Sequence, residues 1–269
     1  MYKLLALDMD GTLLRKDKTI SEENLRAIQK AKLNNVKIAL ATGRPMMGIK
    51  KYLNELGLIT EDDYAITFNG AVIQNTKTNE IIDQNLITLN DVKYLYPLSK
   101  KLNVIMHVWS PDTCITEELN PYVKLEHRLN GTGIKLIKPD EINTSTPIVK
   151  VMFVKEESRL LEAMKHLPEE VYEKYTVFRS SPFFLEFLNK NANKGHGVQV
   201  LSQKLNIKRN EIICIGDAGN DIHMIKYAGL GVAMANGFDD TKRAADYITK
   251  SNEEDGVAYI INKFILNCE

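Results

Sequence analysis

One short stretch near the start of the chain decides the fold: Leu4-Leu5-Ala6-Leu7-Asp8-Met9-Asp10-Gly11-Thr12. Its leading apolar residues predict a buried strand, and two carboxylates one residue apart follow at once. These carboxylates would repel each other unless a cation lies between them, and oxygen ligands of this kind suit Mg²⁺. Gly11 allows a close turn whose N–H groups face an anion. Taken alone, the stretch is equally compatible with a solvated acidic turn.

Apolar runs and helical stretches alternate on both sides of a long middle segment. The predicted strands are Leu4–Leu7, Val36–Ala41, Tyr64–Phe68, Ile212–Ile215 and Gly229–Met234. The predicted helices are Ser21–Asn34 with Ser21 as its N-cap, Pro45–Leu56, Gly195–Leu205, Asp221–Tyr227, Asp240–Ala245 and Gly256–Phe264. Strands that alternate with helices predict a parallel sheet covered on both faces. We therefore expect a Rossmann-like α/β core formed by residues 1–83 and 189–269.

The middle segment, residues 84–188, has a different pattern. Strand-like and helical pieces are interleaved there, and Thr176–Ser180 and Phe183–Phe187 predict an antiparallel hairpin. The polar run Asn189–Asn193 then predicts a linker that returns to the core. We expect an α+β domain inserted into the α/β core.

Three more groups of polar residues stand where a predicted strand ends or a helix begins. They are Thr42-Gly43-Arg44, Lys194, and Gly216-Asp217-Ala218-Gly219-Asn220-Asp221. Open parallel sheets bind ligands at the carboxyl ends of their strands, and a hydroxyl beside a free N–H at a helix start suits phosphate. The helix dipole disfavours a lysine at such a start unless an anion is near. Each group alone also fits a structural account, as a helix cap, a surface lysine or a glycine-rich turn, and Arg44 fits either a substrate phosphate or a surface acid.

The charges of the chain are balanced, with 35 basic and 35 acidic side chains. No global field then attracts nucleic acid or an anionic membrane, and no segment approaches the ~20 apolar residues that span a bilayer. Cys114, Cys214 and Cys268 are widely spaced and fit reduced thiols. The N-terminus reaches Asp8 too soon for a signal peptide. We expect a cytoplasmic protein without nucleic-acid or membrane partners, whose oligomeric state the sequence leaves open.

Taken in order, the four polar groups resemble the signature of the haloacid dehalogenase-like phosphatases. That signature is Asp-x-Asp-Gly-Thr, then Thr or Ser, then Lys, then Gly-Asp-x-x-Asn-Asp. The resemblance covers essentially the whole chain and is strongest to the Cof-type branch, which has a large C2-type cap inserted between the second and third motifs. Asn69-Gly70 also resembles a recurrent feature of that branch, with no role assigned to it.

The resemblance implies a mechanism for this sequence. Asp8 would be the nucleophile that forms an aspartyl-phosphate, and Asp10 the general acid and base. Mg²⁺ would be held by Asp8, the backbone carbonyl of Asp10, and Asp217. The phosphoryl oxygens would be bound by Gly11, Thr42, Gly43, Lys194 and Asn220, with Asp221 orienting Lys194 from behind.

The inserted domain would recognise the leaving group of a small phosphate ester. His107, Trp109, His127 and Arg179 are its candidate contacts, and Trp109 fits core packing better. Sugar phosphates are the expected substrates, ahead of flavin mononucleotide and pyridoxal phosphate.

Two further functions share this scaffold. A phosphotransferase or phosphomutase would pass the phosphoryl group to a sugar hydroxyl instead of water. A catalytically silent regulator is disfavoured by the intact Asp8, Asp10, Lys194 and Asp217. A dinucleotide-binding oxidoreductase is excluded because no Gly-x-Gly-x-x-Gly follows the first strand.

Overall fold

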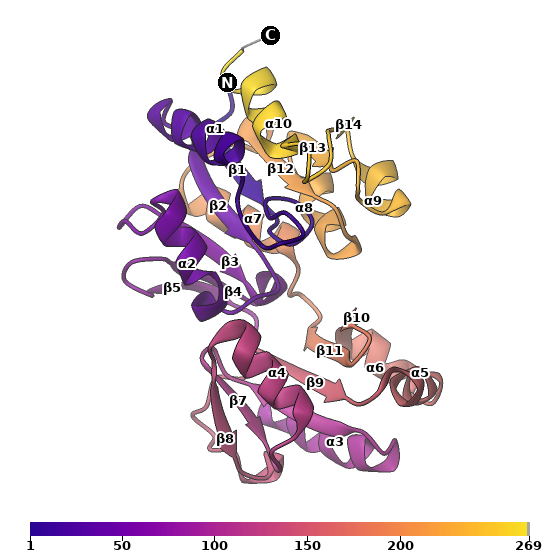
Figure 1. Ribbon diagram of the computed structural model, residues 1–269. Helices are drawn as coiled ribbons and strands as arrows, with labels where there is room; N and C mark the ends of the chain where they lie inside the picture. The colour runs from indigo at the N-terminus through magenta and orange to yellow at the C-terminus, as the bar shows by residue number, and fades with distance from the viewer. Residues whose placement is uncertain (268–269) are drawn as a thin grey trace. The chain divides into compact units, whose positions relative to one another are not determined.

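The computed structural model describes residues 1–267, and the chain divides into two compact units (Figure 1). The first unit comprises Met1–Gly43, Lys50–Gln84 and the residues from Asn193 onward. The second comprises Arg44–Ile49 and Asn85–Ala192. Cys114 and Cys214 are free and buried, whereas Cys268 lies outside the described residues.

The first unit is built on an eight-stranded sheet in the order β14-β13-β12-β1-β2-β3-β4-β5. These strands are β1 Leu4–Leu7, β2 Lys37–Ala41, β3 Tyr64–Thr67, β4 Val72–Asn75, β5 Ile81–Gln84, β12 Ile212–Gly216, β13 Leu230–Ala233 and β14 Tyr247–Ile248. The six strands from β14 to β3 are parallel, which confirms the predicted α/β core. Strands β4 and β5 are antiparallel additions at one edge that the sequence analysis did not anticipate.

Helices connect the parallel strands of this unit. They are α1 Glu22–Leu33, α2 Met46–Leu56, α7 Lys194–Lys204, α8 Ile222–Tyr227, α9 Asp239–Ala244 and α10 Gly256–Phe264. Residues 46–49 at the start of α2 are grouped with the second unit. The Ser21 side chain accepts a hydrogen bond from the N–H of Asn24, as expected of the N-cap of α1. Helices α1 and α10 lie side by side (Figure 1), so the beginning and the end of the chain share one side of the sheet.

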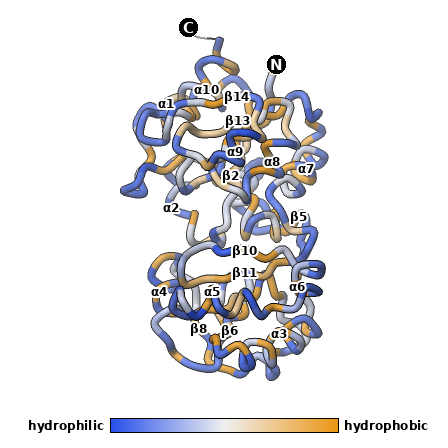
Figure 2. Tube along the Cα trace, turned by 90° about the vertical axis from the view of Figure 1, so that its right-hand side faces the viewer, coloured by the Kyte–Doolittle hydropathy of each residue, from blue (hydrophilic) through white to orange (hydrophobic). Residues whose placement is uncertain are grey.

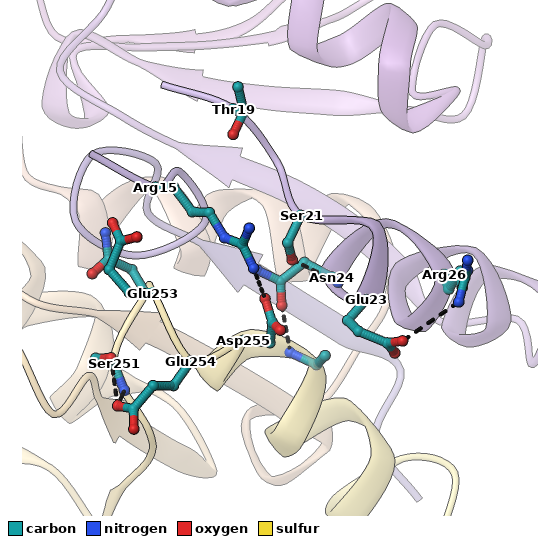
Figure 3. Close-up of polar contacts among 12 residues, drawn as sticks. Arg15, Thr19, Ser21, Glu23, Asn24, Arg26, Ser251, Glu253, Glu254 and Asp255 are labelled. Atoms are coloured by element: carbon teal, nitrogen blue, oxygen red, sulfur yellow. Dashed lines mark hydrogen bonds and ion pairs between the residues drawn. The ribbon is translucent and has the colours of Figure 1, made fainter. Parts of the chain in front are cut away.

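The loop between β1 and α1 is tied to the segment before α10 (Figure 3). Arg15 Nη2 lies 3.0 Å from Asp255 Oδ1, and the backbone N–H of Ala258 donates to Asn24 Oδ1 at 2.8 Å. The buried Asn252 donates its Nδ2 hydrogen to the carbonyl of Leu14 at 2.8 Å. The loop that follows the Asp8–Asp10 stretch is therefore held from outside by residues of the far end of the chain.

The second unit contains a six-stranded sheet in the order β10-β11-β9-β6-β7-β8. Its strands are β6 Ile105–Trp109, β7 Thr113–Thr116, β8 Gly133–Leu136, β9 Lys150–Val154, β10 Tyr175–Ser181 and β11 Phe184–Asn189. Its helices are α3 Leu89–Lys101, α4 Pro121–Asn130, α5 Glu157–Lys165 and α6 Glu169–Lys174. The antiparallel pairing of β10 with β11 confirms the predicted hairpin, and β11 is drawn mostly in the hydrophobic colour in Figure 2.

The two faces of this second sheet differ in chemistry. On one face, Val108 and Phe153 belong to an apolar core with Leu95 of α3 and Leu160 of α5. Their neighbours along the strands point to the other face, because side chains alternate along a strand. That face carries the buried residues His107, Trp109, Lys150 and Glu186. Among residues 1–267, no helix combines the length and the apolar character needed to cross a membrane.

Candidate active site

The carboxylates of Asp8 and Asp217 meet because their strands are neighbours. Strand β1 pairs in parallel with β12, with Leu7 opposite Ile215, so both chains turn at the same edge of the sheet. The N–H of Asp8 donates to the carbonyl of Ile215 at 3.0 Å. Thr12 Oγ1 then donates to Asp217 Oδ1 at 3.0 Å. The first and last polar groups of the sequence thus form one cluster.

Gly11 is required at this point by both conformation and space. Its φ of +89° is a value that L side chains rarely adopt, and a Cβ there would lie 2.4 Å from Asp217 Oδ2. Asn236 Nδ2 donates to the Gly11 carbonyl at 2.8 Å. The turn after Asp10 therefore passes close to the acid cluster, as its glycine predicts.

Lys194 lies at the centre of the site. It begins α7, its side chain is fully buried, and its Nζ lies 2.5 Å from Asp8 Oδ1 and 2.6 Å from Asp221 Oδ1. Burial alone would lower the pKa of this ammonium, but the carboxylates of Asp221 and Asp8 raise it above its ordinary value. Lys194 is therefore a buried permanent cation between two acids.

The acids around Lys194 outnumber it. Burial, and then the carboxylate of Asp221, raise the pKa of Asp8 well above its ordinary value, and Lys194 offsets this only in part. Burial and Asp221 raise the pKa of Asp217 in the same way. Oxygens of Asp8, Asp217 and Asp221 all lie within 4.8 Å of one another, close enough for one divalent cation to contact them.

Asp221 differs from the other two acids because the protein already occupies its oxygens. Its Oδ1 accepts from Lys194, and its Oδ2 accepts the N–H groups of Asp217 and Ala218, both at 2.9 Å. This pattern fixes the loop that carries Asp217 and places the Asp221 carboxylate behind Lys194. Asp8 and Asp217 are the acids best suited to hold a metal ion.

Asp10 stands apart from the buried acids. Its side chain is 39% exposed, and its Oδ1 lies 2.8 Å from Nζ of Lys18. The carboxylate of Asp10 is thus in contact with a cation that the sequence analysis did not consider. No residue pattern predicts this contact, because Lys18 approaches Asp10 through the course of the loop between them. The φ angle of Lys18 in this loop is 65°.

Thr42, Gly43 and Asn220 are brought together by a residue between them in the fold. Thr42 is buried at the end of β2, and its carbonyl accepts the N–H of Asn69 at 2.8 Å. Asn220 Nδ2 donates to Asn69 Oδ1 at 2.9 Å. A Cβ on Gly43 would lie 3.0 Å from Asn69 Nδ2. The Asn-Gly dipeptide after β3 was the only signal of this contact in the sequence.

The candidate contacts of the second unit have partners inside that unit. Asn120 Nδ2 lies 3.0 Å from Nε2 of the buried His107, and Trp109 is buried, as its predicted packing role requires. His127 Nδ1 lies 2.6 Å from the carbonyl of Thr132, and Arg179 Nη2 lies 2.5 Å from Glu157 Oε1. These contacts of His127 and Arg179 therefore lie within the second unit.

The chain is similar to known proteins over nearly its whole length. The haloacid dehalogenase-like hydrolase family matches residues 5–261. The Bacillus subtilis protein named "Putative phosphatase YxeH" is 42% identical over 99% of both chains. A haloacid dehalogenase-like hydrolase from Bacteroides thetaiotaomicron superposes with a TM-score of 0.88 at 34% identity, over 98% of this chain and 100% of that one.

A third relative indicates the branch of the family. The sugar phosphatase BT4131, described as a subclass IIB member of the superfamily, is 27% identical and has a TM-score of 0.81 over 97% of this chain and 98% of its own. The chain therefore belongs to the haloacid dehalogenase-like hydrolases, in their Cof-type branch, and is an enzyme of the phosphoric monoester hydrolase class.

Proposed function

We propose that the protein is a Mg²⁺-dependent phosphatase that hydrolyses small phosphorylated metabolites through an aspartyl-phosphate on Asp8. The observation that carries this proposal is the buried ammonium of Lys194, 2.5 Å from Asp8 and 2.6 Å from Asp221. A fixed cation beside a strand-end carboxylate suits an enzyme that must bring a phosphate dianion against an anionic nucleophile.

The reaction proceeds in two displacements. In the first, a carboxylate oxygen of Asp8 bonds to phosphorus, the bond to the leaving oxygen breaks, and Asp10 donates a proton to that oxygen. In the second, Asp10 takes a proton from water, the water oxygen bonds to phosphorus, and the carboxylate of Asp8 is released. Thr42, Lys194 and Asn220 hold the phosphoryl oxygens throughout, with the N–H groups of the glycines at 11 and 43.

The donor set fits Mg²⁺. Burial and the carboxylate of Asp221 raise the pKa values of Asp8 and Asp217, and a divalent cation would favour the ionised form of both acids. Asp8, Asp217 and the backbone carbonyl of Asp10 would hold the ion. When bound, it supplies positive charge that lowers the repulsion between nucleophile and phosphate.

Sugar phosphates and related phosphorylated polyols are the proposed substrates. BT4131 is described as a sugar phosphatase. The Bacillus subtilis protein YcsE, 31% identical over 98% of this chain and 96% of its own, is named a 5-amino-6-(5-phospho-D-ribitylamino)uracil phosphatase. Because Asp8, Lys194 and Asp217 all belong to the first unit, we assign recognition of the leaving group to the second unit as a cap domain.

The test is substitution of the nucleophile. Asp8→Asn keeps the size of the side chain but removes its nucleophilic oxygen, so turnover of every phosphate ester should cease. Asp63→Asn is the matched control, since Asp63 is also a buried aspartate of the first unit, and it should keep its activity. Beryllium fluoride, which mimics an acyl phosphate, should bind the wild type and not Asp8→Asn. Phosphate release by folded Asp8→Asn protein would refute the covalent route, and transfer to added sugar without free phosphate would favour a phosphotransferase.

A further inference from the structure

A strained turn follows strand β3 on the side of the active site. Phe68, Asn69 and Gly70 form a single 3₁₀ turn in which the φ angles are +50°, +56° and +90°. A bulky residue with positive φ is a conformational outlier, and such backbone strain persists only where surrounding contacts stabilise it. Phe68 and Asn69 are both buried. The fold therefore maintains an unfavourable backbone at this position.

The turn contacts residues of three separate motifs. The N–H of Asn69 donates to the Thr42 carbonyl at 2.8 Å, and Asn69 Oδ1 accepts from Asn220 Nδ2 at 2.9 Å. A Cβ on Gly70 would lie 2.1 Å from the carbonyl oxygen of Asn193, the residue before Lys194. The Asn69 residue therefore lies between Thr42 and Asn220, and the backbone at Gly70 passes close to Asn193.

The hydrogen bond to Asn69 constrains the side chain of Asn220. An amide nitrogen has two hydrogens in the plane of its group. Because one of them is donated to Asn69 Oδ1, rotation of the Asn220 amide is restricted, and so is the direction of its second hydrogen. Asn220 lies in the short turn Gly219–Asp221 and is half-buried, so without this partner its side chain would sample other rotamers.

We propose that Asn69 is a positioning residue, which holds the Asn220 amide in the orientation that binds the transferring phosphoryl group. The proposal rests on the proposed function, in which Asn220 contacts a phosphoryl oxygen. The strained turn is then the means by which the fold delivers the Asn69 acceptor to this place. It assigns a role to the Asn-Gly dipeptide that the sequence singled out.

The first variant is Asn69→Gly, because glycine adopts a φ of +56° without strain while the acceptor is removed together with the rest of the side chain. Asn79→Gly is the matched control, since Asn79 has a φ of 59° in the first unit but an exposed side chain. With p-nitrophenyl phosphate as substrate, Asn69→Gly should lower kcat/KM roughly 10- to 100-fold, more in kcat than in KM. Asn79→Gly should change kcat/KM less than twofold.

A double-mutant cycle separates positioning from a general structural effect. If Asn69 acts through Asn220, adding Asn69→Gly to Asn220→Ala should change kcat less than twofold further. Full multiplicative losses in the double variant would overturn the proposal, as would an unchanged kcat in Asn69→Gly alone.

A second variant covers the case in which Asn69→Gly does not fold. Asn69→Asp keeps an acceptor for Asn220 and tolerates positive φ, so Asn220→Ala should cost as much in this background as in the wild type. A smaller cost there would contradict the proposal. Failure of the proposed function itself is seen separately, as wild-type protein that releases no phosphate or as active Asp8→Asn protein.

Discussion

Replacement of Lys194 by methionine should expose how strongly the acid cluster depends on one buried cation. At an effective dielectric constant of about 20, unit charges 2.5 Å apart attract by about 6 to 7 kcal/mol, most of which offsets the loss of hydration. Removal of one partner from a buried ion pair costs about 3–5 kcal/mol, because the remaining charge is left uncompensated. We expect Lys194→Met to lower the free energy of unfolding of the first unit by that amount at pH 8.

The loss in free energy of unfolding caused by Lys194→Met should be smaller at acidic pH. Without Lys194, the pKa of Asp8 rises further above its ordinary value, because burial and Asp221 already raise it and Lys194 lowers it. As the pH falls, the folded variant takes up a proton at this site more readily than the unfolded chain does. Protonation removes the uncompensated charge, so Lys194→Met should be closer in stability to the wild type at pH 5 than at pH 8.

The matched control is Lys3→Met. Lys3 Nζ lies 2.6 Å from Glu211 Oε1, the same separation as Lys194 from Asp221, but the Lys3 side chain is 55% exposed. Exposed ion pairs contribute about 0–1 kcal/mol. The two variants therefore compare ion pairs of equal length that differ in burial. Lys3→Met should lower the free energy of unfolding by less than about 1 kcal/mol.

The assay is urea unfolding in a chelating buffer with two optical probes. The single tryptophan of the chain, Trp109, belongs to the second unit, so its fluorescence reports that unit, whereas far-ultraviolet circular dichroism reports both. Lys194→Met should move the circular-dichroism transition of the first unit to a lower urea concentration. The transition of the second unit, followed by Trp109 fluorescence, should not move. Equal losses for Lys194→Met and Lys3→Met at pH 8 would refute the reasoning.

Two further predictions concern the metal and a buried histidine. Asp217→Ala removes a proposed ligand and should raise the half-saturating Mg²⁺ concentration at least about tenfold in a phosphate-release assay; an unchanged value would exclude Asp217 as a ligand. Burial lowers the pKa of His107 to about 4, so the unfolded chain, with a histidine pKa of about 6.5, binds a proton that the folded chain does not. Stability should therefore fall by up to about 3 kcal/mol as the pH drops from about 6.5 to about 4. His107→Gln should lose this slope in the Trp109 fluorescence transition, and an equal slope in wild type and variant would contradict the assignment.

The sequence predicts the parallel core well because its signals are local. An apolar run such as Leu4–Leu7, bounded by polar neighbours and too short for a typical helix, predicts a buried strand, and its predicted bounds match β1. The predicted helix Gly256–Phe264 likewise has the bounds of α10. Strands β4 and β5 were missed because each joins two apolar residues to two polar ones, Val-Ile-Gln-Asn in β4 and Ile-Ile-Asp-Gln in β5, so neither has the continuous apolar pattern of β1.

Helix α4 shows why capping signals alone are insufficient. Asn120 accepts from the Val123 N–H as N-cap, Pro121 stands in the first turn, and Gly131 follows the helix with a φ of 67°. The helix still lacks an apolar stripe, since Val123 and Glu126 are its buried residues. Such a burial pattern gives no apolar repeat for a sequence to reveal.

The contacts of the candidate site also divide into those that the sequence predicts and those that it does not. Asp8, Thr42 and Asp217 could be grouped from the sequence because parallel strands end at one edge of a sheet. The contacts of Asn69 with Asn220 and of Lys18 with Asp10 depend on the course of loops in three dimensions. No spacing in the sequence encodes them.

The interleaving of the two units has a consequence for synthesis on the ribosome. Strand β1 lies between β2 and β12, so one of its edges stays open until the last third of the chain has been made. The second unit, by contrast, has all of its strands between residues 105 and 189 and can complete its sheet earlier. Until Asn252 and Asp255 emerge, the loop after the nucleophile also lacks its supports. Nascent chains should therefore depend on chaperones to shield this open strand edge, and chains halted before β12 should aggregate through it.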